Sequence, residues 1–87
     1  MTAVSVLGAG SWGTALAVLL AERNPILWDH REARAARIEA TRRNERYLPG
    51  VHIPDGVRVT GELRAAVQGA GVLVIAIFWL HTGSVWP

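Results

Sequence analysis

The sequence of 87 residues contains no cysteine and no lysine. Without cysteine the chain can form neither disulfides nor thiolate metal sites, and this composition fits a reducing cytoplasm. Nine arginines face seven acidic residues, an excess too small to predict a nucleic-acid-binding protein. The longest apolar run, at 72–80, is too short to span a membrane, which takes about 20 residues. The N-terminus also lacks the basic segment of a signal peptide.

So short a chain forms at most one small domain, which buries only about 60–65% of its unfolded surface. Hydrophobic residues make up 51% of the sequence, a high share for a unit of this size. We therefore expect a part of a larger protein, in which other segments cover the apolar surface.

The most informative segment lies near the N-terminus. An apolar run at 3–7 precedes the pattern G-x-G-x-x-G at 8–13, and a segment with one apolar helical face follows. The glycine pattern alone is weak, because glycines recur in ordinary turns between a strand and a helix. The strand before it and the helix after it favour a dinucleotide-binding turn.

Each glycine of the pattern has a separate purpose in such a turn. Gly8 allows a tight turn, Gly10 allows the backbone to approach a phosphate, and Gly13 allows the helix to pack closely on its strand. The free N–H groups near Ser11 and Trp12 then point at the anion, at the positive end of the helix dipole. The segment therefore predicts a pyrophosphate site.

The remaining segments alternate between strand and helix patterns. We expect strands at 3–7, 26–28, 57–60 and 72–77, and helices at 12–23, 29–43 and 62–68. The helix over 29–43 has only Ile38 as a large apolar residue, which places it at an edge. The continuous aliphatic run of the last strand is typical of a parallel strand buried on both faces. The fold class is α/β, a partial Rossmann-type doubly wound parallel sheet of four strands in order 3-2-1-4.

Three polar residues follow the second strand, where this fold contacts the adenosine ribose. Asp29 lies about 20 positions after Gly8, where a carboxylate binds the ribose hydroxyls, whereas an arginine such as Arg31 accommodates a 2′-phosphate. With His30 beside them, these residues leave NAD and NADP both open. Asp29 and Glu32 also have the spacing of a capping box, so a cap and a ribose contact are equally open for Asp29.

A loop rich in proline and glycine covers 44–56. Its Tyr47 either contacts the adenosine or covers the core beneath the loop. His52 and His81 have no partner at metal-ligand spacing, so we expect no metal site.

Together these motifs resemble the N-terminal part of the NAD(P)-dependent glycerol-3-phosphate dehydrogenase family. The likeness depends on the glycine motif at 8–17, on Leu27-Trp28, and on the segment R-R-N-E-R-Y-L-P-G at 42–50. The last segment is the most discriminating, and it argues against other Rossmann oxidoreductases such as ketopantoate reductases or hydroxyacyl-CoA dehydrogenases. With Pro54-Asp55-Gly56 and the last strand, the likeness covers about residues 3–77.

The resemblance implies NAD or NADP as the cofactor and, in the full-length parent, glycerol 3-phosphate as the substrate. The parent enzyme moves a hydride between C2 of this substrate and the nicotinamide, in glycerophospholipid metabolism. The alternative is a non-catalytic dinucleotide-binding module. The expected cofactor-binding residues, from the motif and the resemblance together, are Gly8, Gly10, Ser11, Trp12, Gly13, Asp29, His30, Arg31 and Tyr47.

Three departures from the family pattern change these expectations. The connection before the second strand is short and lacks the family's Gly-His pair, which predicts a displaced second strand. Asp29 replaces a commonly small residue, which would shift the preference toward NAD. Residues 78–87 replace the family's Pro-Ser turn and next helix, so we divide the chain into a partial domain at 1–77 and a divergent tail, as a frameshift would produce.

We expect no catalytic residue in this chain. The family's lysines are absent, and its substrate pocket comes from segments beyond those that the likeness covers. The isolated chain should therefore have no dehydrogenase activity. Its last strand lacks a neighbour, and an uncovered aliphatic edge predicts self-association.

Overall fold

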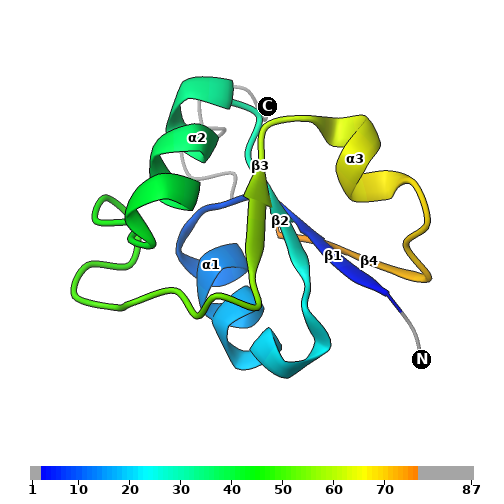
Figure 1. The fold of residues 1–87 in the computed structure, drawn as a ribbon, viewed down its shortest axis with the longest axis horizontal. Coiled ribbons are helices and arrows are strands. Elements are labelled where there is room, and N and C mark those ends of the chain that lie inside the picture. Colours follow the sequence, from blue (N-terminus) through cyan, green and yellow to red (C-terminus); the bar gives the residue numbers. More distant parts are fainter. Residues whose placement is uncertain (1–2, 77–87) are drawn as a thin grey trace, which may run out of the picture.

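A parallel four-stranded sheet in the order β3-β2-β1-β4 forms the centre of the fold (Figure 1). The computed structural model describes residues 3–76, so the predicted tail at 78–87 lies outside the described residues. Within the described part, no helix is long and apolar enough to cross a membrane. The elements are β1 (Val4–Leu7), α1 (Ser11–Leu19), the short 3-10 helix η1 (Ala21–Arg23), β2 (Ile26–Trp28), α2 (Glu32–Thr41), β3 (Arg58–Thr60), α3 (Leu63–Val67) and β4 (Val72–Ile75).

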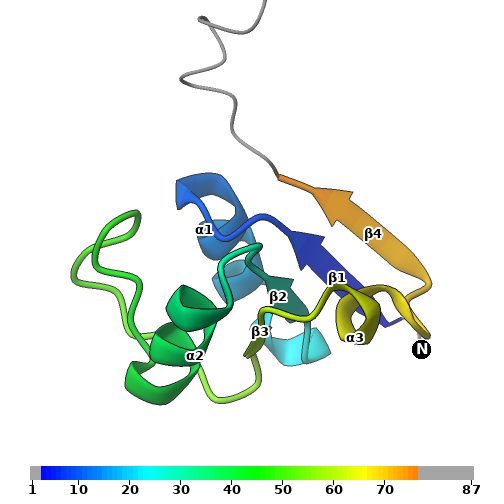
Figure 2. The same ribbon diagram turned by 90° about the horizontal axis from the view of Figure 1, so that it is seen from above.

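The predicted strand order is confirmed, and the helices cover the sheet on both faces. Helices α1 and α2 lie on one face, and α3 lies on the other (Figure 2). Helix α2 packs at the β3 edge and buries only Ala35 and Ile38, as expected from its thin apolar face. Because all strands are parallel, the segments that follow β1 and β2 meet at one end of the sheet.

The core is a row of aliphatic side chains across the sheet, under α1 and α2. Val6 pairs with Leu27 and Leu27 with Val59, and all three are almost fully buried. Val74 on β4 continues the row beside Val6 but is only partly buried. Each fully buried aliphatic side chain stabilises the fold by about 1.5–3 kcal/mol.

The prediction that the last strand is buried on both faces is wrong for the described residues. Val72 and Leu73 are each 44% exposed and Ile75 is 69% exposed. Two features explain this exposure: β4 pairs with β1 alone, and α3 packs against β1, β2 and β3. The aliphatic composition of β4 is suited to burial, yet the described chain covers only one of its edges.

The second strand is not displaced. It pairs with β1 in parallel register, from Ser5↔Ile26 to Leu7↔Trp28. The chain reverses within a short distance because α1 ends at Leu19 and a 3-10 turn follows. Asn24 then takes the left-handed conformation with φ of 50°, as asparagine can where glycine is more usual.

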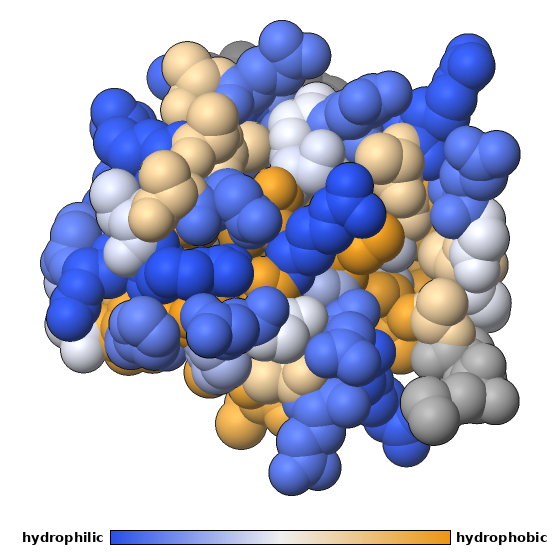
Figure 3. All heavy atoms as spheres, viewed as in Figure 1, coloured by the Kyte–Doolittle hydropathy of each residue, from blue (hydrophilic) through white to orange (hydrophobic). Residues whose placement is uncertain are grey.

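Figure 3 shows where polar and apolar side chains gather on one face of the molecule. Hydrophilic residues cover most of the side formed by α2 and the 44–56 loop. Hydrophobic surface shows between them and toward α3 and the β1–β4 side (Figure 3). The polar side is the one that borders the ends of β1 and β2.

Candidate functional site

The glycine turn between β1 and α1 has the geometry that the motif predicts. Gly8 has a φ of 121°, a conformation that residues with a side chain rarely adopt. Its N–H donates to the carbonyl oxygen of Trp28 at 2.8 Å, so the turn is joined to the end of β2. A Cβ at Gly13 would lie 1.7 Å from the carbonyl oxygen of Gly8, so α1 packs against the turn too closely for any side chain there.

Gly10 differs from Gly13, because no atom of residues 3–76 requires it to be glycine. A Cβ built at Gly10 meets nothing within 4 Å. The backbone there is extended, with φ of −82°, which suits any residue. Among the described residues the space in front of Gly10 is therefore open, as the approach of a phosphate to the backbone requires.

The first turn of α1 presents free N–H groups beside this space. The first helical hydrogen bond runs from the Thr14 N–H to the carbonyl oxygen of Gly10. The N–H groups of Ser11, Trp12 and Gly13 have no acceptor among the described residues. No side chain caps the helix and no acidic residue lies in its first turn. This end of α1 therefore offers unpartnered donors and a positive dipole to an anion.

Asp29, directly after β2, is already engaged by the protein. Its carboxylate is 1% exposed and accepts from Nε of Arg34 on one oxygen and from Nη2 of Arg34, at 2.8 Å, on the other. The Arg31 N–H lies 3.4 Å from Oδ1, as does Nδ1 of His30. Hydrogen bonding to Asp29 raises the pKa of Arg34 above its ordinary value, so the guanidinium stays charged.

The capping-box interpretation of Asp29 is wrong. Helix α2 begins at Glu32, with Arg31 as its N-cap residue, and it has no side-chain cap. Asp29 therefore lies two residues too early to occupy the N-cap position. The carboxylate turns instead toward Arg34 on the buried side of the helix.

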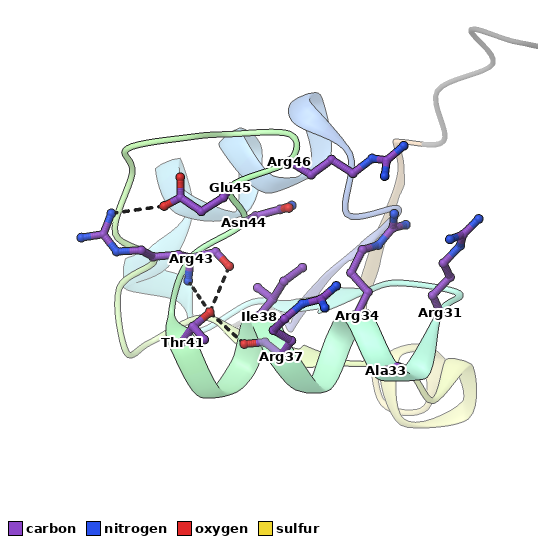
Figure 4. Close-up of a pocket in the computed structure, with 10 residues that line it drawn as sticks. All are labelled: Arg31, Ala33, Arg34, Arg37, Ile38, Thr41, Arg43, Asn44, Glu45 and Arg46. Carbon is purple, nitrogen blue, oxygen red and sulfur yellow. Dashed lines mark hydrogen bonds and ion pairs between the residues drawn. The ribbon is translucent and has the colours of Figure 1, made fainter.

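A pocket of about 580 Å³ lies between α2 and the segment that follows it (Figure 4). Five of its lining residues are arginines, and Glu45 is its one acidic lining residue. Glu45 lies 3.5 Å from Arg43, which offsets its charge. The sequence interpretation included Arg31 alone among the arginines of this pocket, which are Arg31, Arg34, Arg37, Arg43 and Arg46.

Tyr47 lies between two of these arginines. The guanidinium carbons of Arg34 and Arg46 are 5.3 Å and 5.4 Å from the centre of its ring, in cation–π range. Its carbonyl oxygen accepts from the hydroxyl of Ser11 at 2.7 Å, which joins the loop to α1. Hydrogen bonding to Arg46, and secondarily to Arg34, lowers the pKa of the Tyr47 phenol.

This environment predicts an early titration of Tyr47. Its phenol should ionise below its ordinary value of 10.0, and Arg46→Gln should move the midpoint upward. Tyr47 is the single tyrosine, so the ultraviolet absorbance of tyrosinate measures it directly. At pH values between the lowered pKa of folded Tyr47 and its ordinary pKa in the unfolded chain, the unfolded chain binds more protons at this phenol. The contribution of Tyr47 to the free energy of unfolding therefore rises with pH in this window. An unchanged midpoint in Arg46→Gln would contradict the contact.

Asn44 is a residue of the candidate site that the sequence interpretation did not include. It is 3% exposed, and its Nδ2 donates to the carbonyl oxygen of Ala9 at 2.9 Å and to Oγ1 of Thr14 at 2.8 Å. These bonds hold the 44–56 loop against the glycine turn. The available signal was its place in the 42–50 segment, three residues before Tyr47.

Replacing Asn44 with alanine should loosen the loop and destabilise the fold. The change leaves the buried Ala9 carbonyl and Thr14 hydroxyl without their donor, at a cost of about 1–3 kcal/mol. Urea unfolding followed by circular dichroism measures the loss. Glu45→Ala, at the exposed neighbour, is the matched control and should change the free energy of unfolding by less than about 1 kcal/mol. Equal effects of the two variants would show that Asn44 does not hold the loop.

The expected residues thus lie in two groups at the ends of β1 and β2, and Tyr47 is connected to the first group. The glycine motif and α1 form the first group at the end of β1, Asp29 to Arg31 form the second at the end of β2, and Tyr47 joins the first through Ser11. Trp12 and His30 are exposed, at 73% and 66% (side chain) respectively. Among residues 3–76, no group of three or more histidine, cysteine, aspartate or glutamate side chains could hold a metal ion.

Known proteins are similar in sequence to this chain. Residues 3–86 match the family described as NAD-dependent glycerol-3-phosphate dehydrogenase N-terminus. Glycerol-3-phosphate dehydrogenases named for NAD(P)+ from Chlorobium phaeobacteroides and Geobacillus kaustophilus are 53% and 46% identical, over 85% and 88% of this chain. Both alignments cover 23% of the relative, so the chain spans about a quarter of the length of these relatives.

Solved structures agree with the sequence match. Glycerol-3-phosphate dehydrogenase from Coxiella burnetii superposes with a TM-score of 0.80 at 32% identity, over 94% of this chain and 26% of that chain. The enzyme from Saccharomyces cerevisiae superposes with a TM-score of 0.78 at 27% identity, over 87% of this chain and 26% of that one. The chain therefore belongs to the family of the N-terminal domain of NAD-dependent glycerol-3-phosphate dehydrogenase.

Proposed function

We propose that this chain is the dinucleotide-binding N-terminal part of a glycerol-3-phosphate dehydrogenase and that it binds NAD or NADP by the pyrophosphate. The supporting observation is the first turn of α1, where three N–H groups have no acceptor among the described residues and open space lies before Gly10. A pyrophosphate supplies the acceptors that these groups lack. The family match supports the same ligand.

The remaining expected residues would then contact the adenosine half of the cofactor. His30 and Arg31 follow β2, at the end of the sheet where this fold holds the ribose. The Tyr47 carbonyl oxygen accepts from Ser11 on α1, which supports a contact of its side chain with the adenine or the ribose.

Catalysis belongs to the complete enzyme in this proposal. Bound nicotinamide would supply the hydride transfer, and glycerol 3-phosphate would be the substrate of the full-length parent. The chain has no lysine to serve as proton donor or substrate ligand. We expect purified chain to give no turnover above a blank with glycerol 3-phosphate and either cofactor, and clear turnover would contradict this assignment. Its cytoplasmic location also stays a prediction.

Calorimetric titration of the purified chain tests the proposed binding. NAD+, NADP+ and ADP should each bind saturably, because all three carry the diphosphate. Nicotinamide mononucleotide is the control and should bind at least about tenfold more weakly, because it has one phosphate and fewer charge-assisted hydrogen bonds. Absence of binding by all three diphosphates would overturn the proposal.

We also propose that the exposed edge at β4 makes the isolated chain self-associate. Three large apolar side chains of β4 are exposed, and one edge of the strand is unpaired among the described residues. Light scattering should show species larger than a monomer, and Ile75→Lys should reduce them. Leu19→Lys is the matched control, because Leu19 is 81% exposed on α1 and away from this edge. A monomer in the unmodified chain would contradict the proposal.

A further inference from the structure

We propose that the ion pair between Asp29 and Arg34 makes this chain prefer NADP over NAD, an inference that rests on the proposed function. Asp29 alone suggests the opposite preference, because a carboxylate after the second strand accepts from the ribose hydroxyls of NAD. The structure shows that this carboxylate is closed off by Arg34. Arg34 would thus act through Asp29, as a positioning residue.

The backbone places Asp29 at the ribose end of the site. The Gly8 N–H bond to Trp28 joins the glycine turn to the residue before Asp29. The Asp29 N–H donates to the carbonyl oxygen of Thr60 at 3.0 Å, so its main chain is fixed from the β3 side as well. An unpaired carboxylate at this position would face a cofactor whose pyrophosphate lies at α1.

The side chain of Asp29 is paired and buried, so a ribose hydroxyl does not reach it in this arrangement. Both oxygens accept from the guanidinium of Arg34, and the Arg31 N–H and the His30 ring lie 3.4 Å from Oδ1. The side chain is 1% exposed. Ribose hydroxyls could use it as an acceptor only if the paired arrangement opened. NAD therefore does not gain the hydrogen bonds that its ribose hydroxyls would donate to a free carboxylate at this position.

The charges that remain near this position favour a phosphate. With Asp29 and Arg34 neutralising each other, Arg31 and Arg46 extend from the same pocket without a carboxylate partner among the described ion pairs (Figure 4). Glu45 is the acidic side chain of the pocket, and it pairs with Arg43. A 2′-phosphate therefore meets a net positive surface, whereas an unmasked Asp29 would repel it.

Dissociation constants for NADP+ and NAD+, measured by calorimetry on the full chain, test this proposal. The variants are Arg34→Gln, Asp29→Asn and the double variant Asp29→Asn/Arg34→Gln. Arg37→Gln is the matched control, because it removes one arginine of the same helix and pocket without touching the pair. Circular dichroism establishes that each variant is folded.

The unmodified chain should bind NADP+ about tenfold more tightly than NAD+ or better, as charge-assisted bonds to a phosphate predict. Arg34→Gln should lower this ratio by about tenfold, because it unmasks the Asp29 charge. The double variant should recover the ratio of the unmodified chain, since no carboxylate is left to unmask. Asp29→Asn should not lower the ratio, because it removes a buried carboxylate and leaves the Arg34 guanidinium free to attract a phosphate. Arg37→Gln should lower the ratio by less than about threefold, because the pair stays intact and one of several arginines is lost.

Each contrary result has a separate meaning. A double variant as poor for NADP+ as Arg34→Gln would show that Arg34 contacts the phosphate directly and would overturn the proposal, as would an unmodified chain that prefers NAD+. The Arg34→Gln variant would leave the buried Asp29 carboxylate unpaired, and this could prevent folding. In that case the test is the comparison of the affinity ratio of the double variant with that of the unmodified chain. Failure of the unmodified chain to bind either dinucleotide would overturn the proposed function itself.

Discussion

Replacing Gly13 with alanine is expected to destabilise the domain strongly, with a large fall in its urea midpoint. The new Cβ would lie 1.7 Å from the carbonyl oxygen of Gly8 and 3.3 Å from Cβ of Ala76, so α1 would have to move off the sheet. Overpacking of this kind costs about 3 kcal/mol or more. A domain of this size has a total stability of roughly 5–10 kcal/mol, so the loss is a large part of it.

Urea unfolding of the Gly13→Ala variant, followed by circular dichroism, measures this effect. Gly10→Ala is the matched control, because the same methyl group at Gly10 meets nothing within 4 Å. A midpoint for Gly13→Ala equal to that of Gly10→Ala would show that α1 does not need close contact with the glycine turn. That result would contradict the described packing of α1.

The same Gly10→Ala variant should lose dinucleotide binding while it stays folded. Its methyl group would project into the open space before the free N–H groups of Ser11, Trp12 and Gly13. A phosphate displaced from these donors loses charge-assisted hydrogen bonds, which are worth about 1.5–3 kcal/mol each, so we expect at least about tenfold weaker binding of ADP.

Calorimetry with ADP and with adenosine separates this effect from general damage to the site. Adenosine lacks the diphosphate, so any weak binding that it shows should be the same in both chains. Undiminished ADP affinity in Gly10→Ala would show that the diphosphate does not approach the backbone at Gly10. Together with the Gly13→Ala result, this variant separates the glycine that the fold needs from the glycine that the ligand needs.

The sequence predicts those features that depend on local pattern. The β1 strand, the glycine turn and the order of the four strands follow from β-forming runs, glycine spacing and the handedness of crossovers, and the structure confirms them. The aliphatic composition of β4 predicted a buried strand, but three of its four residues are exposed. That composition indicates a buried strand, whereas burial itself depends on neighbours that composition does not reveal.

Two contacts of the site, those of Asn44 with Ala9 and of Asp29 with Arg34, were not predicted from the sequence. Asn44 holds the loop through Ala9, 35 positions away, and no local pattern marks that bond. For Asp29, the nearby Glu32 suggested a cap, but the start of α2 lies later and Arg34 takes the carboxylate. Spacing shows which residues can reach each other along a helix, but it does not show which contact forms.

Amide chemical shifts of the nitrogen-15-labelled chain, recorded while ADP is added, test the central claim most directly. The largest shifts are expected at the N–H groups of Ser11, Trp12 and Gly13, with a common dissociation constant. Shifts confined to other parts of the chain, such as the arginine-lined pocket, or no shifts at all, would contradict it. Either result would show that the first turn of α1 does not hold the diphosphate.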